Sequence, residues 1–206
     1  MQPRPPHPDR QRWDARYAQS QAPGFEPHPL AVRALAVPPP AGPVAELASG
    51  PSGSALLAAA AGRRVTAVDI SGVALGMLAA EAARRGLVGL ITLAETDLAE
   101  WRPAAGGYAL VLCTGFWDRA VFAAAAAAVR PGGVIGWEAF TAAARQARPG
   151  LPAAWCLASG EPASLLPAGF VVLHEGDVGD GRGAKRRLLA QRRPATRRAA
   201  AGPCAG

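Results

Sequence analysis

The chain alternates between two hydrophobic patterns. Short, nearly continuous apolar runs predict strands buried on both faces, and Ala-rich segments with good helix propensity lie between them. The expected strands are residues 43–48, 63–69, 87–95, 108–114 and 134–140, followed by 169–175 and 184–191. The expected helices are residues 10–19, 30–37, 55–62, 73–85 and 118–130, with a short one at 161–168.

Strands joined by helical crossovers predict a parallel sheet with right-handed connections and helices on both faces, the doubly wound α/β architecture. Gly86 ends the helix at 73–85, and a Pro-Gly-Gly turn at 131–133 ends the helix at 118–130. The last two strands, joined by the turn-rich sequence GDVGDGRG, are expected to pair antiparallel.

Length and composition predict one domain, because 206 residues suffice for one core of ordinary size. We expect N-terminal cap helices at 1–40, the main domain at 41–191 and a disordered basic tail at 192–206. The polar, Pro-rich start lacks signal-peptide character and there is no apolar run of about 18 residues, so we expect a cytoplasmic location without a membrane span. Cys113, Cys156 and Cys204 lack zinc or disulfide spacing and are interpreted as free thiols.

The formal net charge of +7 is concentrated at the end of the chain. All fifteen acidic residues precede Arg182, whereas eight basic residues follow from that position on. The body of the protein is therefore about neutral. The charge is weak evidence for a nucleic-acid partner, and a solvated tail is the simpler interpretation.

The sequence ELASGPSGS at 46–54 joins the first strand to its helix. In open α/β sheets ligands bind beyond the carboxyl ends of the strands, where Gly50 and Gly53 would let a ligand approach the backbone. Asp69 ends the second strand, where its carboxylate could accept both hydroxyls of a ribose. The loop lacks Gly-x-Gly-x-x-Gly, and Glu46 would repel a pyrophosphate but attract an ammonium group. The pattern therefore favours a nucleoside that carries an ammonium, a description that S-adenosylmethionine fits.

These features resemble the class I S-adenosylmethionine-dependent methyltransferases. Their pattern is an acid and a glycine series after strand one, an acid ending strand two, an Asp after strand three and Pro-Gly-Gly before strand five. The matching positions are Glu46, then Ala48, Gly50 and Ser52, then Asp69, Asp97 and RPGG at 130–133. The resemblance implies a Rossmann-like seven-stranded sheet of order 3-2-1-4-5-7-6, mostly parallel with an antiparallel final strand. RWDARYA and LCTGFWDR look most like small-molecule methyltransferases of the tellurite-resistance and thiopurine type.

The resemblance also implies which residues hold the cofactor. Glu46 would support the loop and meet the methionine ammonium, Asp69 would hold the ribose, and Asp97 with the Leu98 backbone would meet the adenine. The implied cofactor-binding set is Glu46, Ala48, Ser49, Gly50, Asp69, Ile70, Asp97, Leu98 and Cys113.

Two family glycines are replaced, by Ala48 and Ser52, and Gly53 would take over by a one-residue shift. A side chain at Ser52 would lie against the cofactor. If that position needs a positive φ, the cost is ~1 kcal/mol or more.

The substrate is expected at the ends of the fourth and fifth strands, where aromatic faces would attract a sulfonium and exclude water. The aromatic residues there are Phe116, Trp117, Trp137 and Phe140. The family resemblance implies that Trp13 and Tyr17, one turn apart on the first helix, form a lid. The predicted substrate-binding set is Trp13, Tyr17, Phe116 and Trp117, with core packing as the alternative role of these side chains.

Methyl transfer from a sulfonium mainly requires alignment, so the sequence assigns no catalytic residue. Asp118 and Glu138 are candidates for a general base, with a helix cap and a buried ion pair as their structural alternatives. No metal site is expected, because His7, His28 and His174 have no partners at ligand spacing and receive no role.

The predicted activity is S-adenosylmethionine-dependent methyl transfer to an unidentified small molecule by in-line displacement. Nucleic-acid methylation is disfavoured, because CTGFW stands where base methyltransferases carry Asn/Asp-Pro-Pro-Tyr/Phe and Lys185 is the only lysine. A catalytically silent cofactor-fold protein and an NAD(P)-dependent oxidoreductase remain as alternatives.

Overall fold

The computed structural model describes residues 7–20, 24–38, 40–179 and 184–195. Its sheet contains β1 (Val44–Leu47), β2 (Val65–Asp69), β3 (Ile91–Glu95), β4 (Tyr108–Thr114), β5 (Val129–Phe140), β6 (Phe170–Gly179) and β7 (Ala184–Arg192). The strand order is β3-β2-β1-β4-β5-β7-β6. The first five strands are parallel to their neighbours in the sheet, in the pairs β3–β2, β2–β1, β1–β4 and β4–β5. β7 is antiparallel to both β5 and β6. The predicted fold class and strand order are confirmed.

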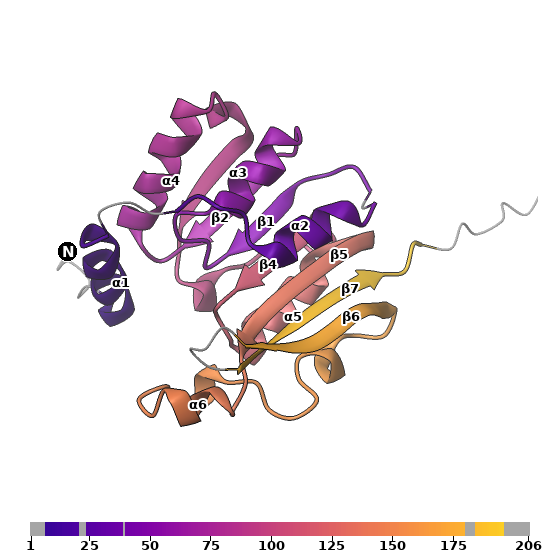
Figure 1. Cartoon of the computed structure of the whole chain (residues 1–206). Helices are drawn as coiled ribbons and strands as arrows, with labels where there is room; N and C mark the ends of the chain where they lie inside the picture. The colour runs from indigo at the N-terminus through magenta and orange to yellow at the C-terminus, as the bar shows by residue number, and fades with distance from the viewer. Residues whose placement is uncertain (1–6, 21–23, 39, 180–183, 196–206) are drawn as a thin grey trace, which may run out of the picture.

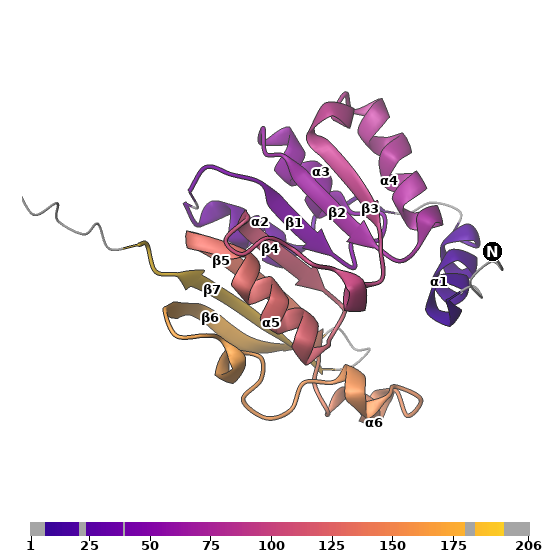
Figure 2. The same ribbon diagram turned by 180° about the vertical axis from the view of Figure 1, so that it is seen from behind.

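Helices cover both faces of the sheet (Figures 1 and 2). On one face, α2 (Pro29–Ala36), α3 (Gly53–Ala60) and α4 (Gly72–Arg84) contribute side chains such as Leu30, Leu56 and Leu78 to one buried apolar cluster. On the other face, α5 (Arg119–Ala128) packs Val121 and Phe122 into a second cluster. The near-continuous apolar strands are therefore buried on both sides, as their sequence pattern predicts.

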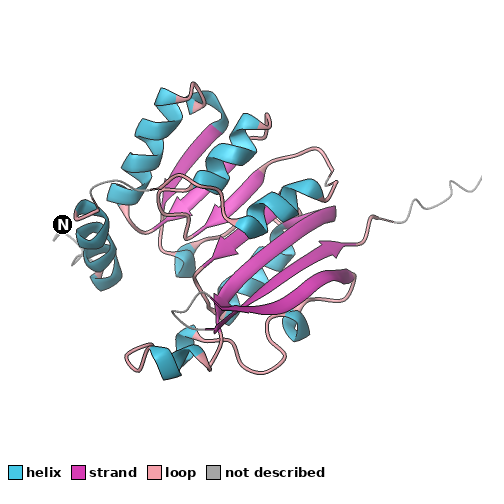
Figure 3. Ribbon diagram, in the orientation of Figure 1, coloured by secondary structure: helices cyan, strands magenta, loops and turns pink. Residues whose placement is uncertain are grey.

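Two further helices lie at the end of the sheet where the parallel strands finish (Figure 3). They are α1 (Pro8–Ala18) and the short α6 (Ala144–Ala147). Single 3₁₀ turns occur at Val88–Leu90, Leu98–Glu100, Ala153–Trp155 and Ala163–Leu165. No helix in the described part of the chain has both the length and the apolar character needed to cross a bilayer.

Several predicted boundaries are wrong. The short helix expected at 161–168 is one 3₁₀ turn, and β5 begins at Val129, so the Pro-Gly-Gly turn lies within the strand, where the register with β4 shifts. Arg192, the first residue of the predicted tail, instead ends β7, and its Nη1 donates to the Val129 carbonyl at 2.6 Å. Residues 196–206 of the predicted tail, with Cys204, lie outside the described residues.

Candidate active site

The loop after β1 is built around two buried polar side chains, Glu46 and Ser52. Ser52 Oγ donates to Glu46 Oε2 at 2.6 Å and accepts from the backbone N–H groups of Ser54 and Ala55, both at 3.0 Å. Ser52 is thus the N-cap of α3, in extended backbone with φ −87°. The strain expected at Ser52 does not arise, because its side chain turns toward Glu46 in a conformation that any residue adopts.

The left-handed positions of the loop are Ala48, with φ +49°, and Gly50, with φ +57°. A Cβ at Gly50 would lie 2.7 Å from the Tyr17 hydroxyl, so a glycine is required there. Gly53 does not take over a ligand-facing role, because its Cα is packed against the backbone of Phe25 and Glu26. Ala48 is therefore the departure from the family pattern that strains the backbone, and its left-handed conformation costs about 1–2 kcal/mol.

Replacing Ala48 with Gly is expected to raise the free energy of unfolding by about 0.5–1 kcal/mol, because the relief of strain exceeds the added entropy of the unfolded chain. Urea unfolding measures the change. The control is Ala80→Gly, at an exposed position inside α4, which should lower the free energy of unfolding by about 1 kcal/mol. Equal losses in both variants would show that Ala48 is not strained.

Asp69 connects the loops that follow β1 and β2. Only 6% of Asp69 is exposed; its Oδ2 accepts from the Gly50 N–H at 2.7 Å and its Oδ1 from the Ser71 N–H at 2.8 Å. Burial raises the pKa of Asp69, and the hydrogen bonds from Ser71 and Gly50 oppose that rise. A carboxylate offers about four acceptor sites, so the backbone hydrogen bonds from Ser71, Gly50 and Ile70 leave acceptor capacity for a ligand.

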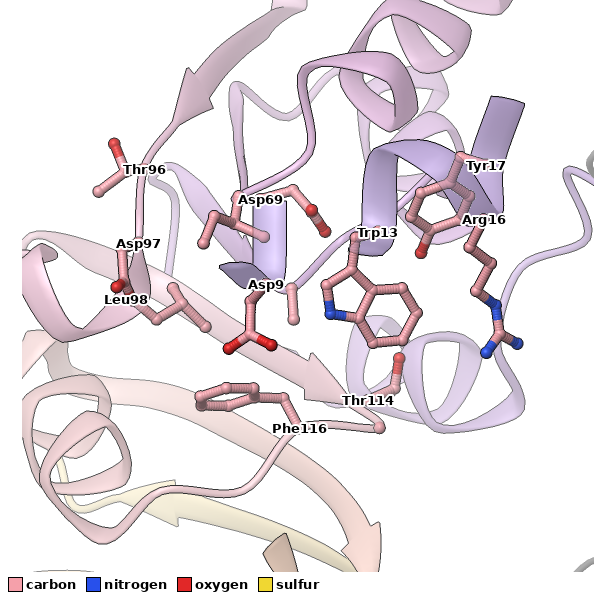
Figure 4. Close-up of a pocket in the computed structure, with 13 residues that line it drawn as sticks. Asp9, Trp13, Arg16, Tyr17, Asp69, Thr96, Asp97, Leu98, Thr114 and Phe116 are labelled. Carbon is pink, nitrogen blue, oxygen red and sulfur yellow. The ribbon is translucent and has the colours of Figure 1, made fainter. Parts of the chain in front are cut away.

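A cavity of about 340 Å³ opens beyond the ends of β1, β2, β3 and β4, and we call it the strand-end cavity (Figure 4). Its lining consists of Asp9, Trp13, Arg16, Tyr17, Ala48, Asp69, Ile70, Thr96, Asp97, Leu98, Thr114, Gly115 and Phe116. The structure thus brings together the predicted cofactor residues from the ends of β1, β2 and β3, which are Ala48, Asp69, Ile70, Asp97 and Leu98.

The other predicted cofactor residues do not line this cavity. Glu46 is buried behind Ser52, and the backbone of Gly50 is turned to Asp69. Ser49 Oγ donates to the Gly50 carbonyl at 3.3 Å. Cys113 is fully buried, burial raises the pKa of its thiol well above the ordinary value, and the neighbouring Thr114 lines the cavity in its place. These residues support the site from behind.

Helix α1 covers the strand-end cavity and is fixed to the loops after β2 and β3. Arg10 Nε donates to the Ile70 carbonyl and faces Glu95 Oε1, both at 3.2 Å. Ser71 Oγ donates to Asp14 Oδ1 at 2.5 Å. Trp13 and Tyr17, for which a lid is predicted, both line the cavity, and their rings stack with centroids 5.9 Å apart.

Tyr17 of α1 and His7, the N-cap of this helix, each interact with an acidic residue that lines the cavity. Burial and the nearby Asp69 charge raise the pKa of Tyr17 to about 12, so its phenol stays neutral. His7, which received no role from the sequence, caps α1 through Nδ1 and places Nε2 3.2 Å from Asp97 Oδ2. The contact joins the N-cap residue of α1 to Asp97, the residue predicted to meet the adenine.

A second cavity, also of about 340 Å³, adjoins the first and shares Asp9, Trp13, Arg16, Gly115 and Phe116 with it; we call it the aromatic cavity. Its remaining lining residues are Arg12, Trp117, Phe140, Arg148, Leu151 and Trp155. Of the predicted substrate-binding residues, Trp13, Phe116 and Trp117 lie here, whereas Tyr17 lines only the strand-end cavity.

Sequence reasoning missed Asp9, Arg12, Arg16, Arg148 and Trp155 as cavity residues. The sequence contains a pattern that could have indicated two of them, Arg12 and Arg16. In RQRWDAR, Arg12 and Arg16 are one helical turn apart and flank Trp13, so they share its face of the helix. Nothing comparable marks Arg148 and Trp155, which reach the cavity from the loops after β5.

The predicted general bases occupy structural positions. Asp118 caps α5, accepting from the Val121 N–H at 2.9 Å. Glu138 is 1% exposed, forms ion pairs with Arg187 and with Lys185 Nζ at 3.1 Å, and lies 3.4 Å from His28 Nε2. Burial favours the neutral acid, but these hydrogen bonds prevail and lower the pKa of Glu138 to about 2. Neither carboxylate lines either cavity.

Trp137 belongs to the core rather than to a cavity wall. It is fully buried and packs edge-on against Phe122, with ring centroids 5.1 Å apart. Its Nε1 donates to the Phe116 carbonyl at 3.0 Å and so fixes the loop that carries Phe116. Among the described residues, no group of His, Cys, Asp and Glu side chains is placed to hold a metal ion.

Comparison with known proteins agrees with this geometry. Residues 44–133 match the family model of a methyltransferase domain. The chain has the fold of the class I S-adenosylmethionine-dependent methyltransferases. No curated protein matches the sequence.

Solved structures with this methyltransferase fold share little sequence with the chain. Geranyl diphosphate C-methyltransferase from Streptomyces coelicolor A3(2), solved with S-adenosyl-L-homocysteine, has a TM-score of 0.64 at 13% identity and covers 92% of this chain and 100% of its own. Magnesium protoporphyrin IX methyltransferase from Synechocystis PCC 6803, solved with the same ligand, has a TM-score of 0.62 at 18% identity, with 79% of both chains covered. The cyclase SpnF has a TM-score of 0.61 at 17% identity, with 80% and 78% covered.

Proposed function

We propose that the protein binds S-adenosylmethionine in the strand-end cavity and transfers its methyl group to a small molecule in the aromatic cavity. The observation that carries this proposal is Asp69, a buried carboxylate that lines the cavity and keeps acceptor capacity beside its backbone hydrogen bonds. Such a group suits the two hydroxyls of a ribose. Asp97 and the Leu98 backbone, at the end of β3, are suitably placed for an adenine.

When bound, the cofactor would supply a methyl group on an electrophilic sulfonium, and alignment provides most of the catalysis. Trp13 and Phe116 form the wall that the two cavities share, and their ring faces favour a positive charge there and exclude water. Of the carboxylates in the strand-end cavity, only Asp9 also lines the aromatic cavity, and it pairs with Arg12 at 3.1 Å. We therefore expect an acceptor that needs no dedicated base.

A dinucleotide is a poorer fit for the loop. Pyrophosphates bind to unpaired N–H groups at a helix N-terminus. Here the N–H groups of Ser54 and Ala55 donate to Ser52 Oγ, and that of Gly50 donates to Asp69. The capped loop and the buried Glu46 disfavour an NAD(P)-dependent oxidoreductase.

A protein that binds the cofactor without transferring its methyl group is the second candidate. The strained Ala48 in the cofactor loop favours it, and SpnF, a cyclase with this fold, shows that the fold does not fix the reaction. The narrower likeness to tellurite-resistance and thiopurine-type enzymes and the cytoplasmic location stay predictions.

Isothermal titration calorimetry with S-adenosylmethionine, S-adenosylhomocysteine and NADH tests the proposal. We expect both adenosyl ligands to bind at one site per chain and NADH to give no heat. Binding of NADH, or no binding of either adenosyl ligand to folded protein, would overturn it. Methylated product detected by mass spectrometry would then separate an enzyme from a silent cofactor-binding protein.

A further inference from the structure

Positive charge gathers at the end of the sheet opposite both cavities, where the parallel strands begin. We call this end the strand-start rim, and four separate segments of the chain bring arginines to it: Arg63, Arg64, Arg84, Arg85, Arg130, Arg192 and Arg193. Arg64 immediately precedes β2, Arg85 is the C-cap of α4, which leads toward β3, and Arg130 is the second residue of β5. Arg192 ends β7, which is antiparallel to β5 and therefore finishes at the same end.

Hydrogen bonds hold three of these guanidinium groups along the rim. Arg63 donates from Nε and Nη2 to two carbonyls of the 40–42 loop, at 3.0 and 3.1 Å, and Arg130 donates from Nη1 to a third, at 2.5 Å. Arg192 Nη1 donates to the Val129 carbonyl at 2.6 Å, in the peptide that precedes Arg130. A guanidinium has five N–H donors, so these contacts orient each group and leave it further donors for an anion.

The body of the protein is about neutral as a whole, but the fold separates its charges by end. Acidic residues lie mostly where the strands finish, as Glu95 does on β3 and Glu138 on β5. Glu81, on α4, is close to the rim and pairs with Arg84 and Arg85 at 2.6 and 2.7 Å, so this group of three keeps one net positive charge. The other five arginines of the rim form no ion pair with a carboxylate in the described part of the chain.

The length of the rim matches the phosphate spacing of a nucleic-acid duplex. Four steps separate β2 from β7 in the sheet, and each step is about 4.8 Å, so the row of arginines spans about 19 Å. One strand of a duplex carries a phosphate about every 3.4 Å along the axis, so this length faces about five or six phosphates. Guanidinium groups bind phosphates through paired hydrogen bonds. A row of such groups suits a linear polyanion better than a planar bilayer surface.

The rim offers the backbone of a nucleic acid charge but no ring on which to stack a base. Among the residues that the structure describes, Trp155 is the one exposed aromatic side chain, and it lines the aromatic cavity at the other end. Proteins hold single strands largely by stacking bases on aromatic rings, whereas phosphate contacts alone suffice for a duplex. The rim therefore favours a duplex that is bound without recognition of its bases.

We propose that the strand-start rim binds duplex DNA through its phosphate backbone, independently of base sequence. Both cavities open at the other end of the sheet, so the duplex would hold the protein in place and would not be the methyl acceptor. Arg197 and Arg198 follow the rim in the sequence and carry charge of the same sign. The inference goes beyond the proposed function and does not depend on it.

Fluorescence anisotropy of labelled duplexes of about 20 base pairs, titrated with the full-length protein at several salt concentrations, tests the inference. We expect a dissociation constant on the order of 10⁻⁵ M at physiological salt, equal for two unrelated sequences, and a slope of log affinity against log salt of about −4 to −5. Arg64→Met and Arg193→Met change exposed side chains outside the hydrogen bonds described above. Each should weaken binding of both duplexes and reduce the size of the slope by about 1.

Arg145→Met is the matched control, because Arg145 is also exposed but lies on α6, at the cavity end of the sheet. It should leave the affinity and the slope unchanged. A double variant, Arg197→Met with Arg198→Met, separates the rim from the residues that follow it. No binding of either duplex, a loss confined to the double variant, or equal losses in Arg145→Met and the rim variants would each overturn the inference. Binding to phosphatidylglycerol vesicles without binding to DNA would also overturn it and indicate a lipid surface as the partner.

Discussion

Replacing Asp69 with Ala should weaken binding of S-adenosylhomocysteine by about 100-fold or more. Two hydrogen bonds from ribose hydroxyls to a buried carboxylate would be lost, and a hydrogen bond to a charged group contributes about 1.5–3 kcal/mol. Calorimetry on the variant and the wild-type protein measures the change. The expected loss exceeds that from any other single substitution in the strand-end cavity, because Asp69 would accept from both ribose hydroxyls, whereas Asp97 would meet the adenine alone and the remaining predicted contacts are apolar or come from the backbone.

The same variant leaves the N–H groups of Gly50 and Ser71 without their acceptor, at a cost of about 1–3 kcal/mol each. Asp69→Asn separates the two effects, because its amide keeps one acceptor oxygen, and we expect an intermediate loss of about ten-fold. Asp118→Asn is the matched control: it alters another Asp that accepts a backbone N–H, but one outside both cavities. Unchanged affinity in folded Asp69→Ala would refute the ribose assignment.

The fold was predictable because it depends on patterns that are local in sequence. Apolar strands, helix stops such as Gly86 and caps such as Ser71 each act within a few residues, and their order along the chain determines the sheet. The boundaries that failed depend on pairing across the sheet. β5 begins early because Val129 pairs with Tyr108, and Arg192 extends β7 because it reaches the Val129 carbonyl.

The site was predictable only in part, for a related reason. Asp69, Asp97 and Leu98 follow strand ends, and parallel strands bring their ends to one edge of the sheet. The direction of a single side chain is not fixed in this way: Ser52, in the loop after β1, turns back to Glu46, and Cys113, near the end of β4, turns into the core. Arg12 and Arg16 reach the aromatic cavity through the docking of α1, which hydrophobic periodicity leaves open.

Glu46 and Glu138 show how differently two buried carboxylates behave. Glu138 faces cations and stays ionised, so it stabilises the fold above its unfolded pKa of 4.5 and loses that contribution only as the pH falls toward 2. Within the described part of the chain, no cation is among the groups that shift the pKa of Glu46. Burial, opposed by hydrogen bonds from Ser52 and Ala55, raises the pKa of Glu46 to about 7.

Glu46→Gln is therefore expected to stabilise the protein at pH 8 but hardly at pH 5. Between pH 4.5 and 7 the folded state keeps a proton on Glu46 that the unfolded state has released, so the stability due to this group falls as the pH rises. The shift corresponds to a penalty on the order of 3 kcal/mol at pH 8, and the neutral amide, which can still accept from Ser52, avoids it. Urea unfolding of variant and wild type at both pH values measures the difference.

Glu138→Gln is the matched control, because its titration window lies below pH 5. It should destabilise the protein by a similar amount at pH 5 and pH 8, since Lys185 and Arg187 lose their partner at both. A Glu46→Gln effect that does not change between these pH values would place the pKa of Glu46 outside the window.

The loop needs Ser52 as the cap of α3, and Ser52 needs an acceptor in Glu46. A cationic ligand in the adjoining cavity would favour the ionised carboxylate, so saturating S-adenosylmethionine should reduce the advantage of the variant at pH 8.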